Sequence, residues 1–183
     1  MSNRANPLTD AVCREGMLRA GRSLRQVYED GSDTAAREDM ALASLMGGLA
    51  LANAKLGAVH GFAGVIGGMY PAPHGIICAR LLPFVMETNV QALQERAAGS
   101  HYLDRYADVA RILTGDPGAA AADGVYWIHD LCQRLAVPGL SEFGVRREDF
   151  PAIISKSQKA SSMKGNPIEL TADELNHILD RAL

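Results

Sequence analysis

The stretch from Met40 to Ala79 constrains the fold more than any other, because it contains a single formally charged residue, Lys55. Such a run is typical either of a membrane hairpin or of a helix enclosed by other helices. Polar residues and helix breakers interrupt both candidate spans, namely Asn53, Lys55, His60, Gly67, Gly68, Pro71 and Pro73. Because these residue types are costly or rare inside spanning segments, the pattern favours a buried helix over membrane insertion.

The composition predicts one folded domain rather than a disordered or nucleic-acid-binding chain. The chain has 183 residues, of which 48% are hydrophobic and 21% are charged, and its formal charge is −3 without a long basic run. The N-terminus lacks the apolar core of a secretory signal. The three cysteines, Cys13, Cys78 and Cys132, show neither a metal spacing nor a disulfide framework. We therefore expect reduced thiols in a cytoplasmic protein.

Helix signals dominate the chain, and strand signals are absent. We expect one helix from Pro7, capped by Asn6, to Asp30, and a second, central helix from Thr34, capped by Asp33. Further helices are predicted over 74–93 with Pro83 inside, over 100–113, from Asp116-Pro117 to before Pro138, over 147–159, and after a Thr171–Glu174 capping box. No alternating run, Gly-x-Gly-x-x-Gly pattern or phosphate loop occurs. The prediction is a single all-α domain, a helical bundle over residues 1–183.

His60 and His74 are the strongest candidates for chemistry, although their spacing by itself is weak support. They lie fourteen residues apart, which is about 21 Å along one straight helix and too far for one metal ion. The glycine pair and the two prolines between them can reverse the chain and bring the two rings together. Spacing alone favours the alternative that each histidine is a hydrogen-bonded core residue.

A resemblance to a known family changes that balance. The chain resembles the C-terminal helical domain of the iron-containing (group III) alcohol dehydrogenases, which has the dehydroquinate synthase-like fold. The resemblance rests on Ala36-Arg37-Glu38, the segment 44–50, Gly57 to Gly61 around His60, Pro73-His74-Gly75, and Leu81-Leu82-Pro83 through Asn89. It extends from Asn6–Asp10 to Val137–Leu140, Gly144-Val145 and Asn166-Pro167, and so covers nearly the whole chain.

The resemblance implies an incomplete metal site, and we expect weak metal binding because metal sites usually have at least three protein ligands. In the family a divalent iron or zinc ion lies between an NAD(P)-binding domain and the helical domain, held by one aspartate and three histidines. His60 and His74 match two of those histidines, whereas the aspartate and the third histidine belong to an upstream helix that precedes this sequence. Many members carry another histidine four residues after the position of His60, and Gly64 stands there in this chain.

The expected function follows from the resemblance. It implies a truncated, metal-binding C-terminal domain of an NAD(P)-dependent oxidoreductase that interconverts small alcohols and aldehydes, with the NAD(P) site in a separate domain. We expect the chain to be inactive alone and assign no catalytic residue, and the sequence leaves open whether the chain is an enzyme. The alternative is a non-catalytic helical binding or assembly module. In either case we expect no nucleic acid or membrane partner, and we expect a homo-oligomer that hides apolar surface.

The remaining polar candidates are assigned structural or solvated roles. Asp10 is expected to be a solvated helix residue. Cys78, one turn after His74, could face the same cavity as that histidine, but without a histidine pair it is interpreted as a small core residue. His101, His129 and His177 have no partner motif, which favours surface or packing positions. The basic, hydroxyl-rich segment around Lys156, Lys159 and Lys164 is expected to be a solvated helix end.

Overall fold

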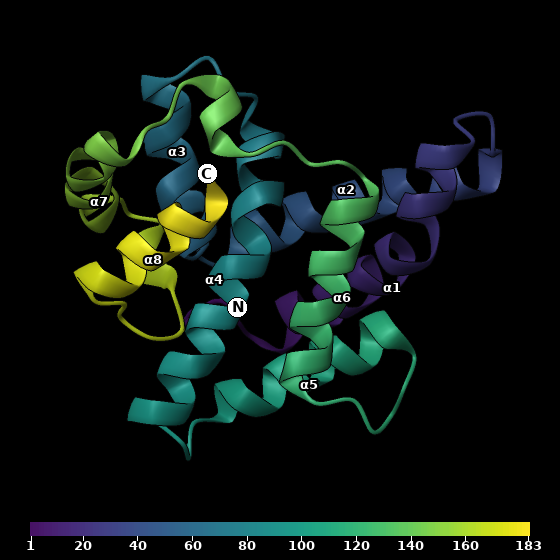
Figure 1. Ribbon diagram of the computed structural model, residues 1–183. Coiled ribbons are helices and arrows are strands. Elements are labelled where there is room, and N and C mark those ends of the chain that lie inside the picture. Colours follow the sequence, from purple (N-terminus) through teal and green to yellow (C-terminus); the bar gives the residue numbers. More distant parts are fainter.

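The computed structural model describes residues 1–183 and contains eight α-helices, three short 3-10 helices and no β-strand (Figure 1). The all-α prediction is therefore confirmed. The α-helices are α1 (Pro7–Glu29), α2 (Thr34–Asn53), α3 (Ala58–Met69), α4 (His74–Arg96), α5 (His101–Thr114), α6 (Ala121–Arg134), α7 (Phe150–Lys159) and α8 (Ala172–Ala182). The 3-10 helices are η1 (Leu140–Phe143), η2 (Arg147–Asp149) and η3 (Met163–Gly165).

Three predicted caps are found at helix starts. The side chain of Asn6 accepts hydrogen bonds from the first turn of α1, and that of Asp33 does the same for α2. Thr171 and Glu174 form the expected capping box of α8. Each cap satisfies backbone N–H groups that have no partner inside the helix.

The predicted start of α6 is wrong. Asp116 does not cap this helix; its carboxylate accepts the backbone N–H of Gly118 at 2.8 Å within a turn. The helix begins only at Ala121, where the Asp123 carboxylate accepts the Ala120 N–H at 2.8 Å. An aspartate followed by proline is typical of a turn as well as of a helix start, and here the local turn prevails.

Helix α4 lies at the centre of the molecule, between α7 and α8 on one side and α5 and α6 on the other (Figure 1). A cluster of 20 buried apolar residues joins it to α3, α7 and α8, and a second cluster of six joins it to α5 and α6. By length and composition α4 could cross a membrane, but 61% of its apolar window is buried within the protein. That burial is expected of a core helix.

The prediction that the second helix is central is wrong. Helix α2 packs mainly along α1, and together they form the hairpin at the right of Figure 1. Only Ala36 and Asp39 of α2 are buried, whereas Leu45 is 60% exposed and Leu51 is 52% exposed. The apolar residues of α2 cover more than one face of the helix, and a single neighbouring helix cannot bury them all. The chain then bends by 98° between α2 and α3, so the apolar run is not one continuous helix.

Candidate metal centre

The two candidate histidines come together where α3 and α4 meet. His60 is the third residue of α3 and His74 is the first residue of α4, and their ring centroids lie 5.5 Å apart. The segment Tyr70–Pro73 between the helices contains two prolines, and it carries the chain back from the end of α3 to the start of α4. The predicted reversal is confirmed, but His60 stands near the start of a separate helix rather than at the end of a long one.

Cys78 completes a group of three side chains of the types that can bind a metal ion. It follows His74 by one turn of α4, and its Sγ lies 3.5 Å from His74 Nε2. One ligand atom from each of His60, His74 and Cys78 lies within 4.8 Å of the other two. His60 and Cys78 are half-buried and His74 is exposed. Cys78 contacts the core as expected, and its thiol also faces the histidines, which is the alternative that its place one turn after His74 left open.

Burial shapes the electrostatics of this group. Burial, and secondarily the neighbouring His74 ring, lower the pKa of His60 below its usual 6.5. Desolvation disfavours the charged imidazolium, and so does a second ring that can itself be charged. Burial also raises the pKa of the Cys78 thiol. His60 is therefore neutral near pH 7, with a ring-nitrogen lone pair available to a metal ion.

The start of α3, which carries His60, is held by a buried asparagine pair. Asn166 Oδ1 accepts two hydrogen bonds, one from the backbone N–H of Ala58 at 3.1 Å and one from Asn89 Nδ2 at 3.3 Å. Asn166 Nδ2 donates to Asn89 Oδ1 at 2.6 Å and to the Ile168 carbonyl at 2.8 Å. These bonds join α3 and α4 to the segment after η3. Both asparagines are landmarks of the family resemblance, but the sequence pattern did not show that they pair.

Close backbone packing explains two glycines beside this start. A Cβ at Gly61 would meet Met163 Cε at 3.0 Å and Met163 Cα at 3.2 Å. A Cβ at Gly165 would lie 1.9 Å from the Leu56 carbonyl oxygen. Only glycine lets η3 approach the first turn of α3 so closely. By contrast, Gly64, one turn after His60, is exposed with open space around it, so no side chain stands at the position for which the resemblance implies a histidine in many members.

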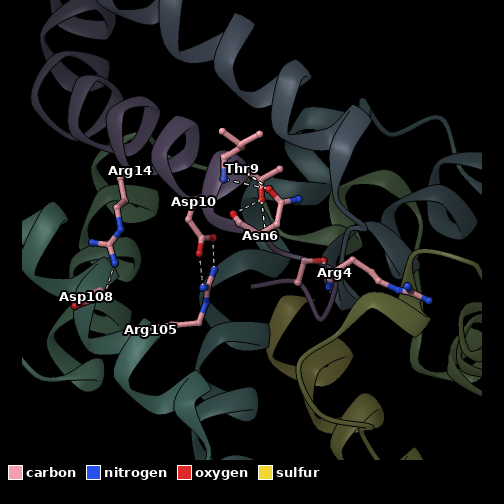
Figure 2. A network of polar contacts seen from close by, with 9 residues as sticks. Arg4, Asn6, Thr9, Asp10, Arg14, Arg105 and Asp108 are labelled. Atoms are coloured by element: carbon pink, nitrogen blue, oxygen red, sulfur yellow. Dashed lines mark hydrogen bonds and ion pairs between the residues drawn. The ribbon is translucent and has the colours of Figure 1, made fainter.

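A mostly apolar cavity of about 500 Å³ extends from His60 and Cys78 toward α1, α2 and α5. Asp10 and Arg105 both line this cavity. They face each other and are joined by hydrogen bonds of 2.7 and 2.5 Å (Figure 2). The hydrogen bonds from Arg105 lower the pKa of Asp10 below its usual value. The expectation that Asp10 is simply solvated is therefore wrong, because its carboxylate is engaged in this ion pair.

The other histidines stay outside the metal group. His101 and His177 are exposed, as expected for surface residues. His129 is half-buried, meets the edge of the Phe84 ring and lies 3.6 Å from Glu87. In the basic segment Lys156 and Lys159 are exposed, as expected for a solvated helix end, whereas Ser157 is fully buried.

Comparisons with known proteins identify the family of the chain. The sequence model described as "Fe-containing alcohol dehydrogenase family, C-terminal" matches residues 1–183. The "1,3-propanediol dehydrogenase" of Klebsiella pneumoniae is 35% identical over 188 residues, which cover 100% of this chain and 46% of that protein. The "NAD-dependent methanol dehydrogenase" of Bacillus methanolicus is 30% identical over 185 residues, which cover 98% of this chain and 46% of that protein.

A solved structure, "Crystal structure analysis of 1,3-propanediol oxidoreductase", matches with a TM-score of 0.89 and 34% identity, covering 100% of this chain and 47% of that one. The chain thus spans about half the length of the curated relatives it matches. The reversal at His60 and His74, the all-α fold and these matches agree, and the chain belongs to the Fe-containing alcohol dehydrogenase family as its C-terminal helical domain.

Proposed function

We propose that this chain supplies the metal-holding half of an NAD(P)-dependent oxidoreductase that interconverts small alcohols and aldehydes, with His60 and His74 as metal ligands. The convergence of both histidines with Cys78, all within 4.8 Å, is the observation that carries this proposal. The names of the relatives, a 1,3-propanediol dehydrogenase and an NAD-dependent methanol dehydrogenase, support the substrate class and the cofactor.

The side chains present fit a divalent transition-metal ion. Imidazole nitrogen and thiolate sulfur are the ligands that zinc and iron accept in proteins. When bound, such an ion acts as a Lewis acid toward an alcohol or carbonyl oxygen. Within this chain, His60 and His74 hold the ion. The mostly apolar cavity of about 500 Å³ beside them has room for a small organic substrate.

Metal retention tests the proposal. The purified chain is loaded with Fe(II) or Zn(II) under anaerobic conditions, dialysed, and its metal content is measured by elemental analysis. Because three side chains of metal-ligand type converge here, we expect nearly one ion per chain, in place of the weak binding expected from two histidines, and loss of that ion in His60→Ala and in His74→Ala. The control is His177→Ala, the same change at an exposed histidine outside the group. Equal metal content in all four proteins would contradict the proposed site.

Turnover is expected to require a dinucleotide-binding partner. Residues 1–183 contain no strand, whereas the glycine-rich dinucleotide site is built where a strand leads into a helix. We therefore expect no NAD(P)-linked alcohol oxidation above background from the isolated, metal-loaded chain. Reduction of NAD or NADP by this chain with a small alcohol would contradict that expectation.

We also infer that the chain self-associates, as an assembly module would. Three exposed leucines lie on one face of α2: Leu42 (37%), Leu45 (60%) and Leu49 (49%). An apolar patch of this kind on one helix is typical of an interaction surface. We expect light scattering to give a dimer or larger species, and Leu45→Lys to shift it toward the monomer. Tyr126→Lys, at an exposed apolar residue of α6 (75%), serves as the control. A wild-type monomer at micromolar concentration would refute this inference.

A cytoplasmic location remains part of the proposal, supported by three cysteines that form no disulfide.

A further inference from the structure

We propose that Cys78 is a third metal ligand, which makes the site a mixed nitrogen–thiolate centre that prefers zinc-like ions to ferrous iron. This inference rests on the proposed metal site at His60 and His74 and adds to it a ligand on α4. It gives the chain three protein ligands of its own, the number found in catalytic zinc sites.

The geometry on α4 already suits chelation. Residues four apart on a helix lie on the same face, one above the other, and Cys78 Sγ lies 3.5 Å from His74 Nε2. Two ligands of a tetrahedral zinc ion, at about 2.0 to 2.3 Å from the metal, are separated by about 3.3 to 3.8 Å. The pair can therefore hold an ion at its present spacing.

His60 provides the third ligand from the facing helix. No ligand atom of the group lies more than 4.8 Å from another, so closing to coordination distances needs a movement of about 1 Å, within the reach of side-chain rotation. His60 and Cys78 both line the cavity, so a small molecule in the cavity would have access to an ion bound between them.

The polar contacts of the three thiols distinguish Cys78 from the other two cysteines. The only polar contact of Cys78 Sγ is His74, whereas Cys132 Sγ donates to the Ala79 carbonyl at 3.4 Å. All three thiols are free of disulfides, and neither Cys13 nor Cys132 belongs to the metal group. The two remaining cysteines therefore offer matched control positions.

A thiolate changes the charge and the selectivity of the site. On binding, the S–H bond is replaced by a sulfur–metal bond and the proton passes to solvent, with no change of oxidation state. The thiolate adds one negative charge to a pair of neutral imidazoles, which by themselves leave the full charge of the ion uncompensated. Sulfur ligands favour zinc over harder ions, and zinc also stands above iron(II) in the general affinity order of divalent metals.

Cobalt(II) titration tests this ligand directly, because cobalt reports its ligands in its absorption spectrum. The full chain is titrated with Co(II) under reducing, anaerobic conditions. We expect a near-ultraviolet sulfur-to-cobalt charge-transfer band together with visible d–d bands. In Cys78→Ser the near-ultraviolet band disappears and Co(II) affinity falls at least about tenfold, about 1.4 kcal/mol. Cys13→Ser and Cys132→Ser keep the band, and circular dichroism verifies the fold of each variant.

The outcomes separate this inference from the function on which it rests. Visible cobalt bands without the near-ultraviolet band in the wild type, or a band that survives in Cys78→Ser, would overturn the role of Cys78 and leave His60 and His74 as ligands. No cobalt binding by the wild type would overturn both. A competition of Zn(II) against Fe(II) adds a second readout: the preference for zinc is expected to shrink in Cys78→Ser, and an unchanged preference would contradict the proposed selectivity.

Discussion

At the residue scale, Asp39 has the densest set of charge-assisted hydrogen bonds on α2. Its carboxylate accepts from Arg19 at 2.7 Å, from Arg22 at 2.6 and 2.8 Å, and from Ser23 Oγ at 2.6 Å. The hydrogen bonds from Arg22 and then Ser23 hold the pKa of Asp39 far below its usual 3.8. Charge-assisted bonds of this kind are stronger than neutral ones. Asp39 therefore joins α2 to α1 by interactions that need its charged form.

The stability of the α1–α2 hairpin is expected to fall in acid through this residue. Because the folded-state pKa is lower than the unfolded one, the unfolded chain binds more protons in acid. The contribution of Asp39 is complete above its usual pKa of 3.8 and is lost as pH falls through that value toward the depressed one. Urea unfolding at about pH 6 and about pH 3 measures it. Asp39→Asn is expected to lower stability at the higher pH and to show a weaker pH dependence than the wild type; parallel profiles would contradict this.

At the element scale, Asn166 determines where α3 begins. Asn166→Ala removes the acceptor of the Ala58 N–H and both partners of the Asn89 amide, which leaves buried polar groups unpaired. We expect a loss of about 1 to 3 kcal/mol in the free energy of unfolding, together with weaker metal retention, because His60 loses its fixed helix start. The control is Asn53→Ala, which removes an exposed side-chain bond to the Leu49 carbonyl. Full metal retention by Asn166→Ala would show that α3 positions His60 without this anchor.

The contact between α5 and α6 depends on one glycine. A Cβ at Gly124 would meet Ala110 Cβ at 3.0 Å and Ala110 Cα at 3.1 Å, and both residues are buried. Gly124→Ala must separate the two helices, and we expect it to cost about 1 to 3 kcal/mol. Gly48→Ala is the matched control on exposed α2, where nothing lies within 4 Å, and is expected to stabilise the chain by about 0.4 to 1 kcal/mol. Chemical denaturation measures both changes; equal effects would refute the steric argument.

At the scale of the whole molecule, two ion pairs connect the α1–α2 hairpin to α5. Asp10 pairs with Arg105, and Arg14 pairs with Asp108 (Figure 2). The Asp10 and Arg105 side chains are each 28% exposed, so water weakens the pair only partly. Many large apolar side chains of α1 and α2 are exposed, so apolar packing holds only part of the hairpin in place. The two ion pairs therefore help to hold the hairpin beside the cavity.

Breaking the Asp10–Arg105 pair is expected to loosen that placement. Asp10→Asn should cost about 1 to 2 kcal/mol, because a partly buried guanidinium loses its charged partner. Glu29→Gln breaks an exposed pair with Arg25 and should change stability by less than about 0.5 kcal/mol. Urea unfolding compares the two variants, and hydrogen exchange of α1 and α2 is expected to rise only in Asp10→Asn. Unaltered exchange would show that the hairpin is held without this pair.

The sequence by itself determined the helical class, most helix boundaries and which two histidines are the candidate metal ligands. Caps such as Asn6, Asp33 and Thr171 act within a few residues, and helical periodicity is a local property, so both can be read along the chain. The family resemblance singled out His60 and His74, and the helix breakers between them were sufficient to predict the reversal.

Only the tertiary structure decided which surfaces are covered and which side chains meet. The apolar composition of α2 suggested a central helix, yet burial depends on how many neighbours a helix has, and α2 packs mainly on one. The pairing of Asn89 with Asn166 and of Asp10 with Arg105 joins residues 77 and 95 positions apart. His74 and Cys78 of α4 meet His60 because α3 folds back against α4. Contacts between distant segments depend on packing of the whole chain, which local patterns do not specify.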